Sequence, residues 1–211
     1  MQSMEPLTDM LKKYPALASC KADIQKAFAL IKETYKAGGK LLICGNGGSA
    51  ADSEHIVGEL MKGFMKSRKI PNEVQDKIKK QALNWEYISQ NLQGALPAIS
   101  LVSQSSIISA FSNDVAADMV FAQQVYGYAK PGDCLIGIST SGNAKNILYA
   151  AETAKAMDMK TIALTGESGG KLKGVCDVAI KAPSSSTPEI QEYHLPIYHT
   201  LCMMIEREFF D

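Results

Sequence analysis

Two stretches rich in glycine and serine could hold a phosphate group. Residues 45–49 read GNGGS and residues 139–143 read STSGN, and each lies between a short apolar run and a helical pattern. Hydroxyl groups together with backbone N–H groups at a helix N-terminus bind a phosphate dianion without needing lysine. Neither stretch has the GxGxxG spacing or the GK[ST] ending of nucleotide sites, so no nucleotide cofactor is expected. The alternative interpretation is a pair of tight turns with capped helices.

A histidine and a carboxylate follow the first stretch. His55 and Glu59 are four residues apart, so on a helix they share one face and can touch or bind one metal ion. The other two histidines, His194 and His199, lie in a segment that Thr187 can cap at its helical start. Structural histidines and a surface pair are the alternatives, but their position beside candidate site elements favours a functional role.

Five short apolar runs predict the strands that would position these residues. Continuous apolar runs are typical of strands buried on both faces of a parallel sheet. The runs are 40–45, 97–102, 133–139, 160–166 and 177–183, and helical patterns separate them at 49–66, 105–128, 144–158 and 188–209. This alternation predicts a three-layer αβα sandwich with roughly five parallel strands, whose ligands bind beyond the carboxyl ends of the strands.

Two further segments are predicted to be helical. Apolar positions recur at helical spacing over 3–37, so region 1–38 is expected to pack N-terminal helices on the outside of the sheet. Segment 65–96 is too long for a turn and predicts an inserted helix over about 73–92. That helix could serve as a lid, as an oligomer contact or as a plain surface helix. The length favours one domain over 1–211.

Composition narrows the possible partners. Lys plus Arg equals Asp plus Glu at 22 each, so no net field recruits nucleic acid or an anionic membrane. Residues 62–80 are basic but carry few aromatic side chains for base stacking, and we expect a solvated helical segment there. No stretch reaches the roughly 20 apolar residues of a membrane span. Five scattered cysteines without CxxC spacing favour a reduced cytoplasm, with Cys44 serving as strand packing.

Four motifs in order carry a resemblance to a known family. CGNGGSAADSEHIVGEL at 44–60, SND at 112–114, ISTSGN at 138–143 and TPEIQEYHLPIYH at 187–199 resemble the sugar isomerase (SIS) domain of the phosphoheptose isomerase family. The resemblance extends over nearly the whole chain outside 65–96. It implies a flavodoxin- or Rossmann-like SIS fold and a homotetramer with sites at subunit interfaces. The implied reaction converts sedoheptulose 7-phosphate to D-glycero-D-manno-heptose 7-phosphate through an enediol.

The same resemblance implies roles for individual residues. Glu59 and His199 would be the acid/base pair. In members that hold zinc, one ion per site would be bound by His55, Glu59, Gln191 and His199. Substrate contacts would come from Glu59 and Gln191 together with Asn46, Gly47, Gly48, Ser49, Asn113, Asp114, Ser139, Thr140 and Ser141.

The residue types suit this chemistry. A carboxylate such as Glu59 can move the proton beside a carbonyl, and an imidazole such as His199 can move the proton between two oxygens. A zinc ion could polarise the carbonyl instead. The first stretch would hold the phosphate while the helix after it brings Glu59 to the carbon skeleton.

The sequence leaves four points open. Gln191 and His199 are eight residues apart, roughly 12 Å of helical rise, so we expect one of them to reach a site completed by a neighbouring subunit. Ala144 follows STSGN where the family commonly has serine, and the loss of that hydroxyl would weaken phosphate binding. Segment 65–96 could reshape the pocket. A regulator that binds a sugar phosphate or a replication initiator without catalysis, or an isomerase of another phosphosugar, is the alternative function.

Overall fold

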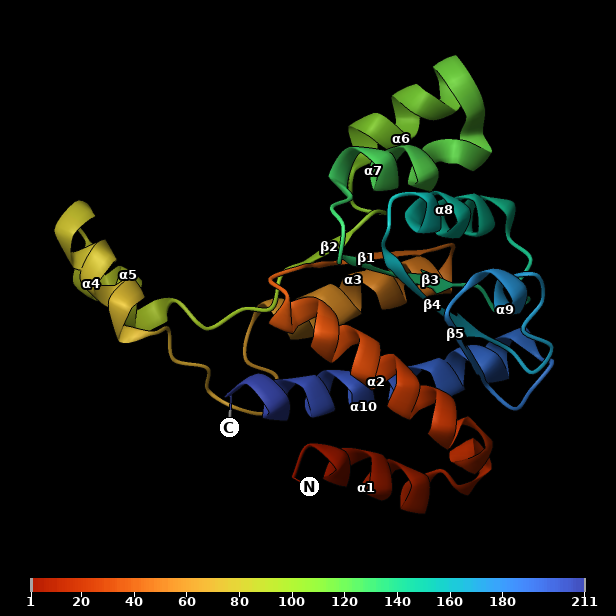
Figure 1. Ribbon diagram of the computed structural model, residues 1–211, viewed down its shortest axis with the longest axis horizontal. Helices are drawn as coiled ribbons and strands as arrows, with labels where there is room; N and C mark the ends of the chain where they lie inside the picture. Colours follow the sequence, from red (N-terminus) through yellow and green to blue (C-terminus); the bar gives the residue numbers. More distant parts are fainter. Residues whose placement is uncertain (1, 211) are drawn as a thin grey trace.

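A five-stranded parallel sheet forms the centre of the molecule. The computed structural model describes residues 2–210, so Met1 and Asp211, which the predicted domain 1–211 includes, lie outside the described residues. The strands, in the spatial order β2-β1-β3-β4-β5, are β1 Leu41–Gly45, β2 Ala98–Ser100, β3 Cys134–Ile138, β4 Lys160–Thr165 and β5 Val178–Lys181 (Figure 1). Each predicted apolar run contains one strand, so the predicted parallel sheet is confirmed.

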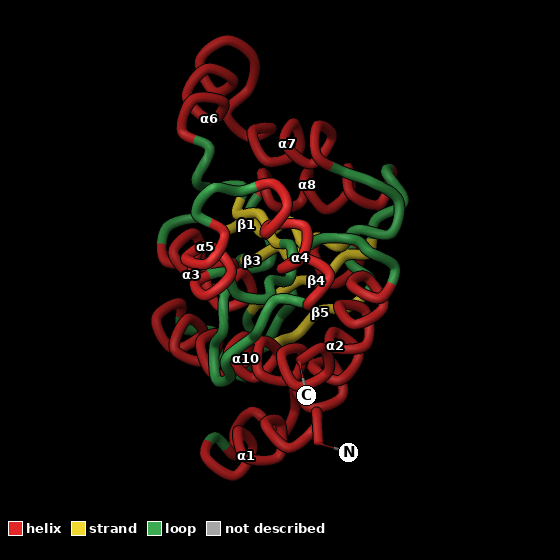
Figure 2. The backbone as a smooth tube through the Cα atoms, turned by 90° about the vertical axis from the view of Figure 1, so that its left-hand side faces the viewer, coloured by secondary structure: helices red, strands yellow, loops and turns green. Residues whose placement is uncertain are grey.

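Helices cover both faces of the sheet, as Figure 2 shows. Leu41 and Ile43 of β1 point into one core cluster, and Leu42 and Cys44 point into the other. The first cluster is closed by α2 Lys21–Lys36, α3 Gly48–Met61 and α10 Thr187–Phe210, with α1 Glu5–Lys13 packed outside α10. The second is closed by α7 Val120–Tyr128, α8 Lys145–Ala156 and the short α9 Leu172–Val175. Complete burial raises the pKa of the Cys44 thiol, in keeping with a packing role.

The N-terminal region is helical but interrupted. The N-terminal helices that the sequence predicts over 1–38 are present as α1 and α2, and a 3-10 segment at Pro15–Cys20 separates them. Pro15 disfavours helical backbone in the residue before it, and Tyr14 accordingly has φ −126° and ψ 74°. The helix predicted over 49–66 ends earlier, at Met61. None of the helices within residues 2–210 combines the length and the apolar character needed to cross a membrane.

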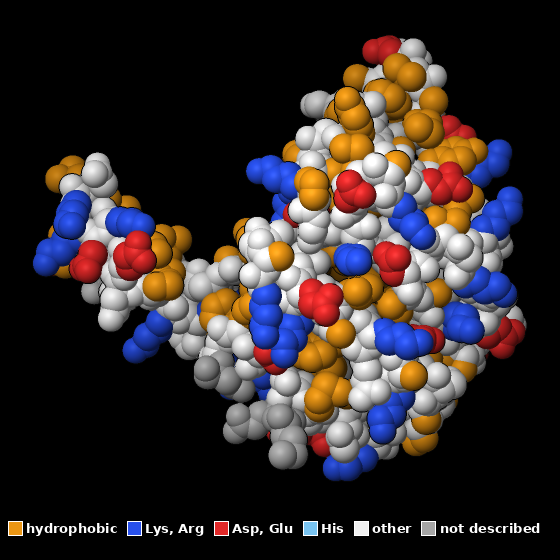
Figure 3. Space-filling model, in the orientation of Figure 1, with side chains coloured by type: hydrophobic (Ala, Val, Ile, Leu, Met, Phe, Trp, Pro, Cys, Tyr) orange, Lys and Arg blue, Asp and Glu red, His pale blue; other side chains and the backbone are white. Residues whose placement is uncertain are grey.

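The inserted segment forms two helices, α4 Asn72–Gln81 and α5 Trp85–Asn91, so the single helix predicted over 73–92 is wrong. Ala82 has extended backbone at φ −112° and ψ 130°, which turns the chain back on itself. Lys79 then lies over the Trp85 ring, with Nζ 5.0 Å from the centroid. We call residues 70–92 the arm, because α4 and α5 pack on each other and stand away from the sheet (Figures 1 and 3).

The helix predicted over 105–128 is also divided. It consists of α6 Ser105–Phe111, a π-helical turn Ser112–Ala116, a 3-10 turn Ala117–Met119 and α7. Ala116 is extended, at φ −160° and ψ 119°, so it ends the first helical run. Short polar side chains such as Asn113 and Asp114 compete with the backbone for hydrogen bonds, which weakens a continuous helix. The other two predicted helices correspond to α8 and α10 within two residues.

Candidate active site

The first glycine-rich stretch is a tight turn that only glycine permits. Gly47 has φ +56°, and a Cβ at Gly45 would lie 2.2 Å from the backbone oxygen of Ser49. The N–H of Ser49 donates to the Asn46 carbonyl at 3.0 Å. The chain therefore passes from the end of β1 directly into the N-terminus of α3, as the sequence predicts.

The second stretch borders an open cleft at the end of β3. Gly142 has φ +66°, and a Cβ there would lie 2.2 Å from the Gly169 carbonyl oxygen, so the loop packs closely on residues 166–170. Thr140 and Ser141 line a cleft of about 240 Å³ together with Asn143, Gly166, Glu167, Ser168, Ser184, Ser185 and Ile190. Ala144, the residue before α8, adds no hydroxyl to this site.

The two loops lie next to each other. They end neighbouring parallel strands, since β1 pairs with β3 along its length. The side chains of Asn46, in the first loop, and Asn146, at the start of α8, exchange two hydrogen bonds of 2.9 Å each. The predicted pair of phosphate-binding turns is therefore one continuous edge, lined by hydroxyls and by backbone groups at two helix N-termini.

Helices α3 and α10 run side by side in the same direction and bring the ionisable residues together. We call their contact the seam. His55 Nε2 lies 3.2 Å from Glu59 Oε1, and His199 Nε2 lies 3.4 Å from His55 Nε2. Lys62 Nζ is 3.2 Å from the other oxygen of Glu59. The histidine and glutamate predicted from helical spacing do touch, and His199 joins them from the same chain without a second subunit.

Gln191 lies at the other end of the seam. A Cβ at Gly48 would lie 2.6 Å from Gln191 Nε2, so the amide covers the start of α3 beside the first loop. His55 is seven residues further along α3, about 10 Å of helical rise. Gln191 and His199 are thus separated within one chain, as their spacing predicts.

The donor types of the seam suit zinc, although the four predicted ligands are not assembled. Two imidazoles and a carboxylate form a common zinc-binding set. The contacts of His55 with Glu59 and His199 match the ligand separation of about 3.3 Å around a tetrahedral ion with bonds of about 2.0 Å. Within residues 2–210, however, no three His, Cys, Asp or Glu side chains already surround a common metal position. Closing such a site requires side-chain movement, and Gln191 is too distant to join within the chain.

Burial affects the acid/base properties of this cluster. Partial burial, followed by the proximity of His55, lowers the pKa of His199, and Glu59 opposes that shift. A neutral His199 can accept a proton near neutral pH.

Asn113 and Asp114 are not brought to this cluster. Both are exposed in the π-helical turn after α6, where Asn113 Nδ2 donates to Asp114 Oδ1 at 2.8 Å. In Figure 1 α6 and α10 lie on opposite sides of the sheet. Within one chain these two residues and Glu59 do not face one site.

Comparisons with known proteins agree with these features. The family model described as SIS domain matches residues 8–90 and 92–166. The chain belongs to the phosphoheptose isomerase family of SIS-domain proteins. It is 39% identical to the phosphoheptose isomerase of Akkermansia muciniphila, over 93% of this chain and 91% of that protein. It is 40% identical to a probable phosphoheptose isomerase of Thermoplasma acidophilum, over 94% and 98% respectively.

A solved structure supports the same assignment. The phosphoheptose isomerase from Francisella tularensis is similar with a TM-score of 0.71 at 31% identity, covering 98% of this chain and 93% of that one. This likeness extends across the sheet and its helical layers, so the family relationship holds for the whole architecture.

Several supporting residues of this phosphoheptose isomerase family member were not predicted. Arg68 is fully buried, and its guanidinium donates to the carbonyls of Glu59 at 3.0 Å and Leu60 at 2.7 Å and to Glu206 Oε1 at 2.8 Å. Glu206 also accepts the N–H groups of Phe64 and Met65, each at 2.8 Å. The pair holds the C-terminus of α3 against α10. Only the position of Arg68 nine residues after Glu59 was visible in the sequence, and it gives no signal of burial.

Proposed function

We propose that the protein is a sugar-phosphate isomerase that interconverts sedoheptulose 7-phosphate and D-glycero-D-manno-heptose 7-phosphate through an enediol. The observation that carries the proposal is the pairing of two phosphate-binding loops at adjacent strand ends with the cluster of His55, Glu59 and His199. Relatives named phosphoheptose isomerase, about 40% identical over most of the chain, support this substrate.

The proposed mechanism assigns separate tasks to the two parts of the site. Serine and threonine hydroxyls and backbone N–H groups of the loops hold the phosphate, which fixes the sugar at a distance from the reacting carbons. Glu59 removes the proton from the carbon beside the carbonyl and returns it to the neighbouring carbon. His199, neutral because its pKa is lowered, moves the proton between the two oxygens. Zinc, when bound by His55, Glu59 and His199, would polarise the carbonyl.

We further propose that each site is completed by two subunits of a homotetramer. Gly48 and Glu59 are eleven residues apart on one continuous helix, about 16 Å of rise. From its first carbon to the phosphorus, the sugar phosphate contains eight bonds of about 1.5 Å. Laid end to end, these bonds span about 12 Å. Only a fully extended sugar, contacted across about 3 Å at each end, would bridge the two within one chain, so a phosphate loop from one subunit and Glu59 from another is favoured. It also gives the distant Gln191, Asn113 and Asp114 a route to a shared site.

We place the enzyme in the cytoplasm. All five cysteines are free, and Cys20, Cys44, Cys134 and Cys202 are buried as single thiols. Unpaired thiols in this number suit a reducing compartment.

The test is turnover of sedoheptulose 7-phosphate by the purified protein, with and without a chelator, followed by appearance of the aldose. Turnover that the chelator blocks supports both the reaction and the metal. Turnover that the chelator leaves unchanged supports the reaction and restricts catalysis to Glu59 and His199. Binding of the sugar phosphate without turnover would contradict the enzyme and favour a regulator.

A further inference from the structure

A chain of hydrogen bonds supports His55 from the side opposite to the proposed acid/base cluster. Tyr198 donates its hydroxyl proton to Asp52 Oδ1 at 3.3 Å, and His55 Nδ1 lies 3.0 Å from the same hydroxyl oxygen. The other ring nitrogen of His55, Nε2, faces Glu59 and His199. One nitrogen of the imidazole is therefore bound within the fold while the other faces the site.

The order of donors in this chain follows from counting protons. A tyrosine hydroxyl has one proton to donate and can also accept, whereas an ionised carboxylate only accepts. A tyrosine phenol, with an ordinary pKa of about 10, keeps its proton at neutral pH. Because that proton points to Asp52, the Tyr198 oxygen is left as an acceptor, and the partner it needs is an N–H on His55 Nδ1.

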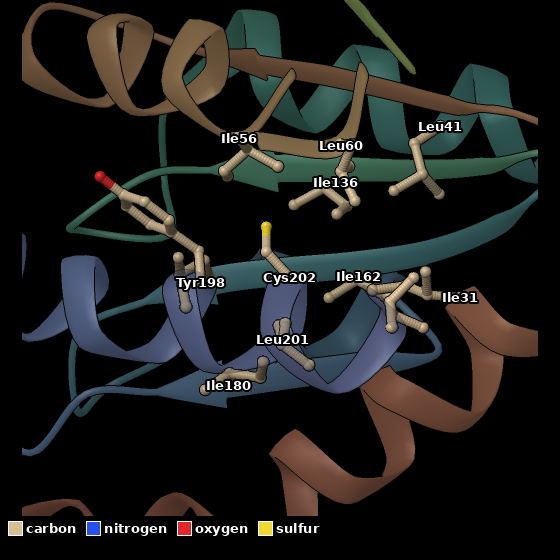
Figure 4. A pocket seen from close by; sticks show the side chains of 12 residues that line it. Ile31, Leu41, Ile56, Leu60, Ile136, Ile162, Ile180, Tyr198, Leu201 and Cys202 are labelled. Carbon is tan, nitrogen blue, oxygen red and sulfur yellow. The ribbon is translucent and has the colours of Figure 1, made fainter. Parts of the chain in front are cut away.

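Packing fixes the Tyr198 side chain in position, so its hydroxyl can orient the hydrogen bonds to His55 and Asp52. It is 2% exposed, and its ring packs against the apolar side chains between α10 and the sheet. Figure 4 shows the hydroxyl oxygen directed away from the other side chains that line this space. The Tyr198 and His55 rings meet edge to face with centroids 5.5 Å apart. Asp52 lies one turn before His55 on α3, so the contact joins the two helices of the seam.

We propose that Asp52 and Tyr198 are positioning residues that hold His55 in the Nδ1–H tautomer against the competing attraction of Glu59 at Nε2, so that the Nε2 lone pair is available to His199 or to a cation. In that tautomer Nε2 can accept a proton or bind a cation, and in the other it can do neither. A hydrogen-bond partner on the second nitrogen commonly sets the tautomer and orientation of a functional histidine. The structural part of this proposal is independent of the substrate, and only its catalytic consequence rests on the proposed function.

Nitrogen NMR of the histidine side chains tests the tautomer directly. The chain has three histidines, so the full-length protein labelled with ¹⁵N-histidine gives three imidazole patterns. Spectra are recorded after chelation, because a metal on Nε2 would set the tautomer by itself, and at about pH 8, where ordinary imidazoles are neutral. The pattern lost in His55→Gln identifies His55. We expect protonated Nδ1 in the wild type and a mixture of tautomers, or Nε2–H, in Tyr198→Phe.

A matched control removes a different tyrosine hydroxyl from the same helix. Tyr193 donates its hydroxyl proton to Glu189 Oε1 at 3.3 Å, in a solvent-exposed hydrogen bond on α10. Tyr193→Phe should leave all three imidazole patterns and the turnover of sedoheptulose 7-phosphate unchanged. Tyr198→Phe should lower kcat about 10- to 100-fold, the usual effect of losing such a supporting hydrogen bond, with KM within about twofold of the wild type.

The outcomes separate the two proposals. Retention of the Nδ1–H tautomer in Tyr198→Phe overturns the positioning role, even if kcat falls, because the loss would then be structural. A tautomer change with unaltered kcat overturns the catalytic consequence. A wild-type protein that does not turn over the sugar phosphate contradicts the proposed function, while the NMR patterns still decide whether Tyr198 holds His55.

Discussion

The seam and the arm, which follows α3 in the sequence, differ in what they bury. At the seam, Ile56, Leu60, Arg68 and Glu206 are each at most 3% exposed. In the arm, neither α4 nor α5 has a buried residue, and Leu83 is 96% exposed. Figure 3 shows the arm standing clear of the body. The contacts of one chain are enough to determine the geometry of the seam, whereas the arm obtains no such support from its own chain.

The same division separates the predicted site residues. His55, Glu59 and His199 lie on the seam, where side chains from two helices contact one another. Asn113 and Asp114 follow α6, which like α4 and α5 has no buried residue. Exposed apolar side chains gather on the arm, at Met61 and Met65 before it, and around α6 and α7, while the rest of the seam exposes few. These two segments are therefore the surfaces that the proposed homotetramer would use for its subunit contacts.

The largest effect is expected at the carboxylate of the seam. Glu59→Gln keeps the shape of the side chain and removes the base, so kcat should fall by about 10²- to 10⁴-fold, while phosphate binding at the distant loops is nearly unchanged. Steady-state kinetics and equilibrium binding of the sugar phosphate measure the two effects. Glu54→Gln on the same helix, where Glu54 accepts a hydrogen bond from Ser103, is the control. Wild-type turnover in Glu59→Gln would exclude Glu59 as the base.

Removing one partner of an ion pair should destabilise the protein much more at the seam than in the arm. Arg68→Met leaves Glu206 buried without its partner and should lower the free energy of unfolding by about 3–5 kcal/mol. On the arm, Lys77 forms an exposed ion pair with Glu73 at 2.5 Å. Lys77→Met removes this pair and should change the free energy of unfolding by no more than about 0.5 kcal/mol. Urea unfolding of the two variants gives both values. Equal losses would show that the arm is stabilised as strongly as the seam.

A buried histidine on α10 should make stability depend on pH. His194 is fully buried, its Nε2 lies 3.2 Å from the Thr165 carbonyl, and burial lowers its pKa to about 4. The unfolded chain therefore binds this proton more readily, and stability should decrease as pH falls from about 6.5 to about 4, by about 3 kcal/mol. Unfolding of the wild type and of His194→Gln across this range isolates the contribution. An identical pH dependence in His194→Gln would show that His194 is not the source of the pH-dependent stability.

The smallest effect on folding is expected in the arm. Leu83→Ser with Tyr87→Ser removes two exposed apolar side chains, so the free energy of unfolding of the subunit should change by no more than about 0.5 kcal/mol. Association should weaken if the arm contacts another subunit, and sedimentation velocity over a range of concentrations measures this. An unchanged oligomer would show that the arm is a surface feature.

Local sequence patterns were a good guide wherever one element determines the outcome. The apolar runs located all five strands, because a strand buried on both faces must be apolar along its length. The glycines located both loops, since Gly47 and Gly142 adopt positive φ. The breaks at Ala82 and Ala116 were missed, because neither residue carries a strong local signal and the tertiary structure imposes the extended backbone.

The sequence by itself determined the parallel sheet, the two loops at its edge and the shared face of His55 and Glu59, because these depend on residue spacing along one element. The tertiary structure decided which side chains meet those residues. His199 and Tyr198 contact His55, and Arg68 contacts Glu206, across distances of more than 130 residues in sequence. Such contacts arise from the packing of α10 on α3, and helical periodicity specifies which face is apolar but not which polar groups the packing brings together.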